Sequence, residues 1–203
     1  MTNMKRNFWI LGIIMFIGLG VYGVQRLKPQ EPIQGKIMLK YTSFETKNPA
    51  LDFTFEYPET GWKTGESQGG VEKYDLVYLR GPVDEKTRFT TLIHITVRPL
   101  EAGKTASDLL KAYLKIDSNL SKFEVSHEET FNVGGEKAFS ALCGYEAIPS
   151  YDLSAPVISF KKQLVLIVRN GRSYEFTYNT FASQFDAYLP ILKHLLKTFQ
   201  FKK

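Results

Sequence analysis

Three separate segments of the chain alternate large apolar residues with polar ones. Phe53, Phe55 and Tyr57 form the first set, Ile93, Ile95 and Val97 the second, and Tyr174, Phe176 and Tyr178 the third. Because successive side chains of a β-strand point to opposite faces of its sheet, each set lies on a single face. The alternation therefore predicts strands that bury one face of a sheet in a hydrophobic core.

Eight segments in all have the length and composition of strands. They are Ile37–Phe44, Leu51–Tyr57, Tyr74–Arg80, Thr90–Pro99, Phe123–Val133, Lys137–Ala147, Ile158–Arg169 and Arg172–Phe181. Asn170-Gly171, between the last two, is a strong signal for a two-residue hairpin turn. Connections this short favour antiparallel pairing of neighbouring strands.

Two helices are expected among these strands. The first begins near Thr105 or Ser107, both good N-cap residues, and continues to Leu120. The second helix has one apolar face and one solvated face. The apolar residues, at helical spacing, are Phe185, Tyr188, Leu189, Leu192, Leu195, Leu196 and Phe199. The residues of the solvated face are Asp186, Lys193, His194 and Lys197. Pro190 is expected to kink this helix or to lie in its first turn. The order of elements predicts an α+β domain in which helices pack on an antiparallel sheet.

The basic charge of the chain is concentrated near its N-terminus. The 203 residues include 26 Lys and Arg against 21 Asp and Glu, a net charge of +5. Residues 1–30 contain four of the basic residues and no acidic one, so 22 basic and 21 acidic residues follow. Nucleic-acid-binding proteins carry a sustained basic stripe that displaces counterions. A balance of +1 after residue 30 therefore argues against nucleic acid as a partner.

These N-terminal charges flank a run of 19 uncharged residues from Asn7 to Gln25. The 17 apolar positions of the run would form a helix about 26 Å long, close to a hydrocarbon core of about 30 Å. Trp9 and Tyr22 lie near its two ends, where such rings favour the membrane interface. We therefore expect one N-terminal transmembrane helix within residues 1–25, with the following domain on the extracytoplasmic side of the membrane.

A cleaved signal peptide is the alternative for residues 1–25. Cleavage prefers an A-x-A-like site, but the first alanine of the chain is Ala50. Residues 26–36 contain Pro29 and Pro32 and are expected to form a short, stiff linker. The globular domain is then expected to comprise residues 37–203.

Residue types that commonly bind metals or carry catalysis are few and scattered. His94, His127 and His194 belong to three different elements, and Cys143 is the only cysteine. A zinc site needs three or four convergent ligands, so we expect no metal site, no cofactor and no catalytic residue. Cys143 shares a strand face with Ala141 and is expected in the core, while His94 is expected to be packed or solvent-facing. An enzyme that pairs Cys143 with His94 or His127 is the alternative.

Two long connections are candidate surfaces for binding a partner protein. The first, Gly61–Lys73, is polar and glycine-rich and contains Trp62 and Lys63. The second, Tyr145–Val157, contains Tyr151 and Asp152. Loops held by a rigid scaffold often carry binding residues. The alternatives are that Trp62 closes the core beneath the sheet edge and that Tyr145–Val157 is ordinary surface.

Several short motifs resemble a known superfamily. Leu51–Lys63 reads LDFTFEYPETGWK, Phe131–Ala138 reads FNVGGEKA, a hairpin follows at Asn170-Gly171, and Lys197–Phe201 closes the chain after a helix. In this order they resemble the PsbP-like superfamily, which is named for an extrinsic subunit of photosystem II. The resemblance covers residues 37–203 and implies an α/β/α sandwich around a central antiparallel sheet.

The resemblance implies a fold more strongly than a function. The superfamily includes photosynthetic subunits, bacterial envelope lipoproteins and a nuclear-import factor, so one fold serves several roles. This chain lacks both the Arg- and Ser-rich transit peptide and the lipidation cysteine of other members. No metal or docking residue of the family can be matched to it.

We therefore expect a non-enzymatic, membrane-anchored domain that binds or helps assemble a partner protein in the cell envelope. The alternatives are an envelope hydrolase or other enzyme with an unrecognised site and an extrinsic subunit of the photosystem II type.

The N-terminal apolar segment is predicted to stay attached to the mature protein, because no A-x-A site follows it. The intact mass of protein isolated from the membrane fraction should equal that of the full chain. A mature N-terminus near Val24 would show that the segment is a signal peptide.

Overall fold

The computed structural model describes residues 39–46, 48, 51–68, 74–85, 89–148 and 156–202. The transmembrane helix expected within residues 1–25 and the linker 26–36 lie outside these ranges. Over the ranges that are described, no helix has the length and apolar character needed to cross a membrane. The predicted domain boundaries therefore stay predictions.

The described ranges form ten strands and two helices. In chain order these are β1 (Tyr41–Phe44), β2 (Phe53–Pro58), β3 (Lys63–Gln68), β4 (Asp75–Val83), β5 (Thr90–Pro99), α2 (Ala106–Asp117), β6 (Ser121–Val133), β7 (Glu136–Ala147), β8 (Ile158–Arg169), β9 (Arg172–Phe181), α3 (Phe185–Thr198) and β10 (Gln200–Phe201). The α+β class and the antiparallel sheet predicted from the sequence are confirmed.

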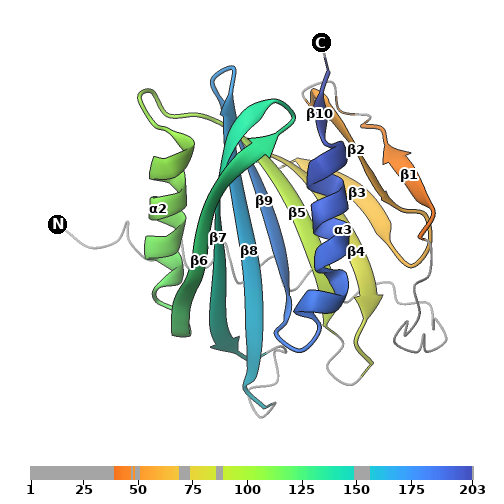
Figure 1. Ribbon diagram of the computed structural model, residues 1–203, viewed down its shortest axis with the longest axis vertical. Coiled ribbons are helices and arrows are strands. Elements are labelled where there is room, and N and C mark those ends of the chain that lie inside the picture. The colour runs from red at the N-terminus through yellow and green to blue at the C-terminus, as the bar shows by residue number, and fades with distance from the viewer. Residues whose placement is uncertain are drawn as a thin grey trace. The chain divides into compact units, whose positions relative to one another are not determined.

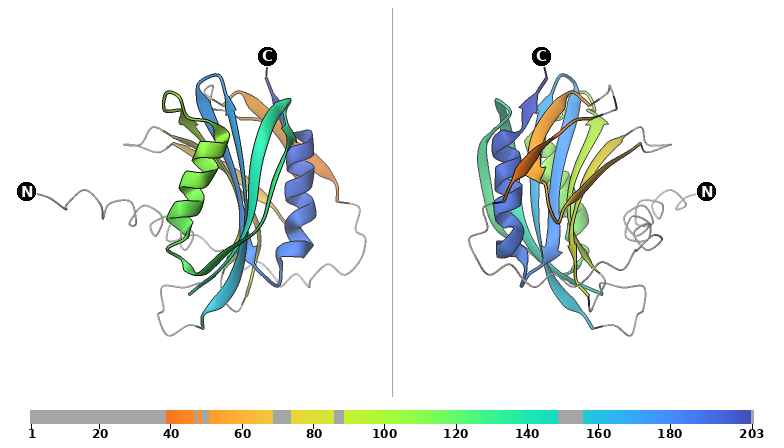
Figure 2. Two further views of the ribbon diagram at one scale, coloured as in Figure 1. Left: turned by 60° about the vertical axis from the view of Figure 1, so that its left-hand side comes forward. Right: turned by 90° about the vertical axis from the view of Figure 1, so that its right-hand side faces the viewer.

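Seven strands make up the central sheet, in the order β3-β4-β5-β9-β8-β7-β6 (Figure 1). Every neighbouring pair is antiparallel. A smaller sheet, β1-β2-β10, lies beside α3, and β10 directly follows that helix in the chain. The two helices lie against opposite faces of the central sheet (Figure 2).

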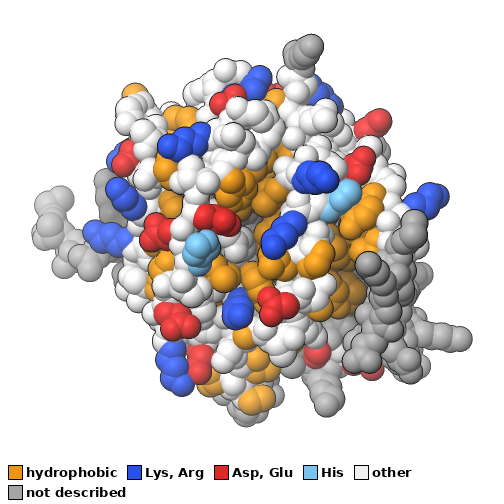
Figure 3. Space-filling view, viewed as in Figure 1, with side chains coloured by type: hydrophobic (Ala, Val, Ile, Leu, Met, Phe, Trp, Pro, Cys, Tyr) orange, Lys and Arg blue, Asp and Glu red, His pale blue; other side chains and the backbone are white. Residues whose placement is uncertain are grey.

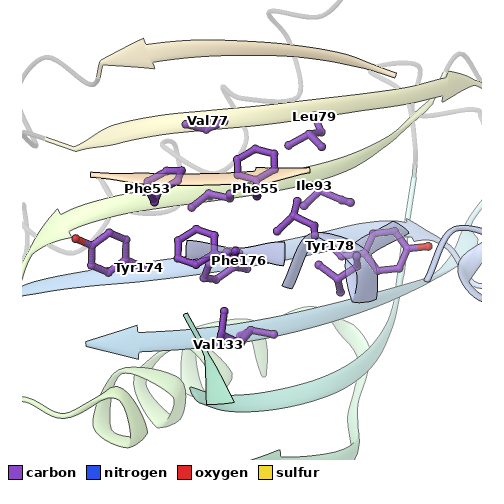
Figure 4. Close-up of a cluster of buried hydrophobic side chains, with 14 of the residues drawn as sticks. Phe53, Phe55, Val77, Leu79, Ile93, Val133, Tyr174, Phe176 and Tyr178 are labelled. Carbon is purple, nitrogen blue, oxygen red and sulfur yellow. The ribbon is translucent and has the colours of Figure 1, made fainter. Parts of the chain in front are cut away.

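The main core lies between the central sheet, α3 and the smaller sheet. Tyr174, Phe176 and Tyr178 of β9 are fully buried in it, together with residues of β2, β4 and β5 that face them (Figure 4). The hydroxyl of Tyr178 donates a hydrogen bond to the Phe185 carbonyl at 2.8 Å, and that of Tyr174 donates to the Asp52 carboxylate at 2.9 Å. Both buried phenol hydroxyls therefore have a hydrogen-bond partner.

Two of the three alternating sets predicted from the sequence are fully buried in this core. In the set that contains Phe53 and Phe55, Tyr57 is only partly buried.

A second, smaller core lies under α2. It consists of Ala106, Leu110, Ala141, Cys143, Leu164 and Leu166. Thr105 is the N-cap of α2: its side chain accepts a hydrogen bond from the Asp108 N–H, and the Asp108 carboxylate accepts one from the Thr105 N–H. This capping box fixes where the helix begins. The helix ends at Asp117, three residues before the predicted end.

Two strands were not predicted. Residues 63–68, expected within a polar loop, form the edge strand β3, and residues 200–201 form β10. The sequence KTGESQ of β3 contains few residues that favour strands. This segment is a strand because it is hydrogen-bonded to β4. Of the predicted first strand, residues 41–44 are observed as β1, and residues 37–38 lie outside the described ranges.

Helix α3 agrees closely with its predicted pattern. Leu192 and Leu195 are buried, as is Ile191, while Leu196 is only partly buried and Lys193 and Lys197 are exposed. Pro190 lies in the second turn rather than the first, and its ring is on the exposed side. There the loss of one backbone hydrogen bond is tolerated because water can reach the freed carbonyl.

Partly buried apolar residues lie at the edge of the main core beside α3. They are Phe131 of β6, Leu142 of β7, and Leu189 and Leu196 of α3. Figure 3 shows hydrophobic side chains at the surface beside this helix. The main core therefore reaches the surface there.

Replacing Leu192 by Ala is predicted to lower the free energy of unfolding by about 2–5 kcal/mol, because the side chain is buried and leaves a cavity. The neighbouring exposed substitution, Lys193→Ala, should lower it by less than about 0.5 kcal/mol. Urea unfolding of the full chain in a non-ionic detergent measures both. Equal losses would mean that the buried side of α3 is assigned incorrectly.

Candidate functional site

The face of the central sheet that carries α2 is only partly covered by it. The helix packs on β7 and β8, at one side of the sheet (Figure 2). Among the described elements, no helix lies over β3 and β4 on this face. Side chains of β3, β4 and β5 that point this way are therefore candidates for contact with another molecule.

The strand register identifies those side chains. One row of directly paired residues runs across four strands, from Leu164 of β8, which lies under α2, through Thr177 of β9 and His94 of β5 to Tyr78 of β4. Directly paired residues of antiparallel strands point to the same face. Two residues along β4, Arg80 is paired with Lys63 of β3, so both share this face as well. We call Lys63, Tyr78, Arg80 and His94 the open face.

Tyr78 is held in a defined position on the open face. A Cβ atom on Gly65, its partner in β3, would lie 2.2 Å from the Tyr78 hydroxyl oxygen and 2.4 Å from Cζ. The phenol therefore lies across the backbone of Gly65, a position that only glycine leaves free. The Arg80 guanidinium lies over the same ring, 4.8 Å from its centroid. These contacts orient the ring and the guanidinium together.

Lys63 and Arg80 are two cations placed directly opposite one another. Both side chains are exposed. Such cross-strand neighbours have Cβ atoms about 4.5–5.5 Å apart, and like charges at this spacing destabilise a sheet. Within the part of the chain that the structure describes, neither forms an ion pair. The register between β4 and β5 also shifts between Arg80 and Val83, so a β-bulge lies next to the pair.

His94 adds a neutral ring to the open face. Its burial, and then the nearby charge of Arg80, lower the pKa of His94 to about 4. The imidazole is therefore uncharged at neutral pH, with one nitrogen able to donate a hydrogen bond and the other able to accept one.

Two polar interactions connect α2 to the central sheet. Lys162 of β8 forms an ion pair with Asp117 of α2, and both side chains are only 13% exposed. Burial and the nearby Glu175 carboxylate raise the pKa of Tyr113, which lies on α2. The ion pair of Lys162 with Asp117 and the interaction of Tyr113 with Glu175 link α2 to the sheet, whereas the two cations at the β3–β4 corner have no carboxylate partner among the described residues.

Of the predicted partner-binding residues, Trp62 is buried and Lys63 is exposed. Trp62 is 7% exposed and packs on the α3 side, against Gly81 and edge-on to Tyr188 at a centroid distance of 6.0 Å. This position fits the alternative in which Trp62 closes the core. The next residue, Lys63, points to the opposite side and belongs to the open face. Tyr151 and Asp152 lie outside the described residues.

The residues of the possible cysteine enzyme are not brought together. Cys143 is fully buried, and burial raises the pKa of its thiol to about 11. On the same face, the register places His94 three strands away, about 14 Å at ordinary strand spacing. His127 is paired with Leu142, on the other face of β7, and is exposed. The core position predicted for Cys143 is confirmed.

The prediction that His194 is solvated was wrong. Its ring stacks on Tyr41 at a centroid distance of 3.6 Å, and Nε2 lies 2.8 Å from the Glu56 carboxylate. Strands β1 and β2 cover this flank of α3, a long-range contact that helical periodicity does not contain. Among the described residues, no three His, Cys, Asp or Glu side chains form a cluster that could hold a metal ion.

The sequence matches no family model and no curated protein. Among solved structures, the chain is similar to the solution structure of cyanobacterial PsbP (CyanoP) from Synechocystis sp. PCC 6803. The TM-score is 0.56 at 13% identity, covering 82% of this chain and 96% of that one. The fold is PsbP-like.

Two further structures share this PsbP-like fold. LpqN of Mycobacterium tuberculosis, described as involved in cell envelope biogenesis, matches with a TM-score of 0.56 at 11% identity, over 82% of this chain and 92% of that one. The Ran-binding protein Mog1p of Saccharomyces cerevisiae matches with a TM-score of 0.50 at 16% identity, over 80% and 96%. At these identities the likeness establishes the fold and leaves the function open.

Protonation of His94 is predicted to destabilise the fold. An unfolded histidine titrates near pH 6.5, whereas the folded-state pKa is about 4, so between these values the unfolded state binds more protons. The contribution of His94 to the free energy of unfolding should be full above pH 6.5. It should fall by about 3 kcal/mol as the pH decreases to 4. Urea unfolding across this range should show a shallower decrease for His94→Gln, while His127→Gln, at an exposed position, should follow the wild type. Parallel decreases in all three proteins would contradict the assignment.

Proposed function

We propose that the chain is a non-enzymatic, membrane-anchored domain on the extracytoplasmic side that binds a partner protein through its open face. One observation carries the proposal. The face lies beyond the reach of α2, and it combines an oriented tyrosine with two exposed cations that have no acidic partner among the described residues. Exposed groups held at a cost to stability are typical of a binding surface.

The N-terminal sequence supports membrane attachment and export. The 19 uncharged residues from Asn7 to Gln25 have the length of a membrane-spanning helix, and basic residues flank them. Residues 26–36 would hold the domain near the bilayer. LpqN, which shares the fold, is described as involved in cell envelope biogenesis, and this agrees with a place in the envelope.

The fold and the buried cysteine support binding rather than catalysis. Mog1p, with the same fold, is named as a Ran-binding protein, so this scaffold can serve protein recognition. The thiol of Cys143 is buried and protonated at neutral pH, which argues against the form of the enzyme alternative that uses Cys143 as its nucleophile. Likeness to cyanobacterial PsbP at 13% identity carries no photosynthetic role to this chain.

Photo-cross-linking in intact membranes tests the proposal. A benzoylphenylalanine residue in place of Lys63 should give an adduct with a specific protein, identified by mass spectrometry. The same residue in place of Lys111, exposed on α2, is the matched control and should not give that adduct. If both positions give the same products, or position 63 gives only lipid adducts, the open face is not a protein-binding surface.

A further inference from the structure

We infer that the partner segment bound at the open face is acidic, with a carboxylate placed between Lys63 and Arg80. The inference rests on the proposed function and specifies the chemistry of the partner.

The first support is the geometry of the two cations. Lys63 and Arg80 are directly opposite each other on adjacent strands and are both exposed. A single carboxylate between them would accept charge-assisted hydrogen bonds from the guanidinium and the ammonium group. It would also remove the repulsion that the free chain carries. The arrangement is thus more favourable with an anion bound than without one.

The second support is the contrast with Lys162 on the same side of the sheet. Lys162 has Asp117 as its partner in a nearly buried ion pair. The chain after residue 30 has a balance of only +1, so an uncompensated pair of cations is a local feature rather than part of a basic surface. A local excess of positive charge selects a partner with a local negative charge.

The third support is the fixed position of Arg80. Tyr78 lies across the backbone of Gly65, and the Arg80 guanidinium lies over its ring, 4.8 Å from the centroid. A guanidinium that is already held in place loses less side-chain entropy when a carboxylate binds it. An anionic membrane surface attracts each nearby basic residue only weakly, so two basic residues are too few to hold the face against it. The combination therefore favours an acidic protein segment.

Fluorescence anisotropy with a labelled deca-glutamate peptide tests the inference on the full chain in a non-ionic detergent at low salt. Binding should be measurable, and Lys63→Glu and Arg80→Glu should each weaken it at least tenfold. Lys111→Glu, which reverses an exposed charge on α2, should change it less than twofold. A deca-lysine peptide should not bind the wild type.

Stability separates a binding role from a structural one. Lys63→Glu replaces the repulsive pair with an attractive one, so its melting temperature should equal or exceed that of the wild type while binding is lost. A mutation that merely disturbed the sheet would lower both. A fall in melting temperature that parallels the loss of binding would overturn the inference.

The remaining outcomes are equally decisive. No binding of deca-glutamate, or the same loss with Lys111→Glu, overturns the inference of an acidic partner. So does tighter binding to phosphatidylserine vesicles that is lost with the same variants. If deca-glutamate fails while the cross-link from position 63 persists, the domain binds a protein of other chemistry and the proposed function stands. If the position-specific cross-link also fails, the proposed function falls as well.

Discussion

The aromatic row of β9 is the packing interaction on which the rest of the domain depends. Tyr174, Phe176 and Tyr178 are fully buried between the central sheet, α3 and the smaller sheet, and their polar ends are hydrogen-bonded. This packing closes one face of the sheet along β4, β5, β9 and β8. On the other face the only described helix, α2, packs on β7 and β8. The asymmetry leaves a corner of a rigid sheet available for another molecule.

Much of this fold was predictable because its strands follow a simple period. The bounds of β5, β8 and β9 agree with the predicted segments, and the apolar stripe of α3 identified its buried side. β3 was missed because its residues have little strand preference and its order comes from pairing with β4. The environment of His194 was missed because Tyr41 and Glu56 reach it from strands far away in the sequence.

The open face shows why the site was only partly predictable. Lys63 was a candidate from its polar, glycine-rich segment, although that segment is a strand. Arg80, Tyr78 and His94 join it only through the register of three strands, and a shift by one residue would turn each to the other face. The contact between Tyr78 and Gly65 likewise follows from pairing that neither local sequence reveals. Fold likeness at 11–16% identity adds no residue to the site.

The central claim, that the open face is occupied in the membrane, is tested most directly by oxidative footprinting of Tyr78. The rate of Tyr78 oxidation should be several-fold lower in intact membranes than in the purified chain, because the partner covers its ring. Tyr57, on the smaller sheet, is the internal reference and should react at the same rate in both samples. Equal Tyr78 rates in membranes and in the purified chain would contradict the account.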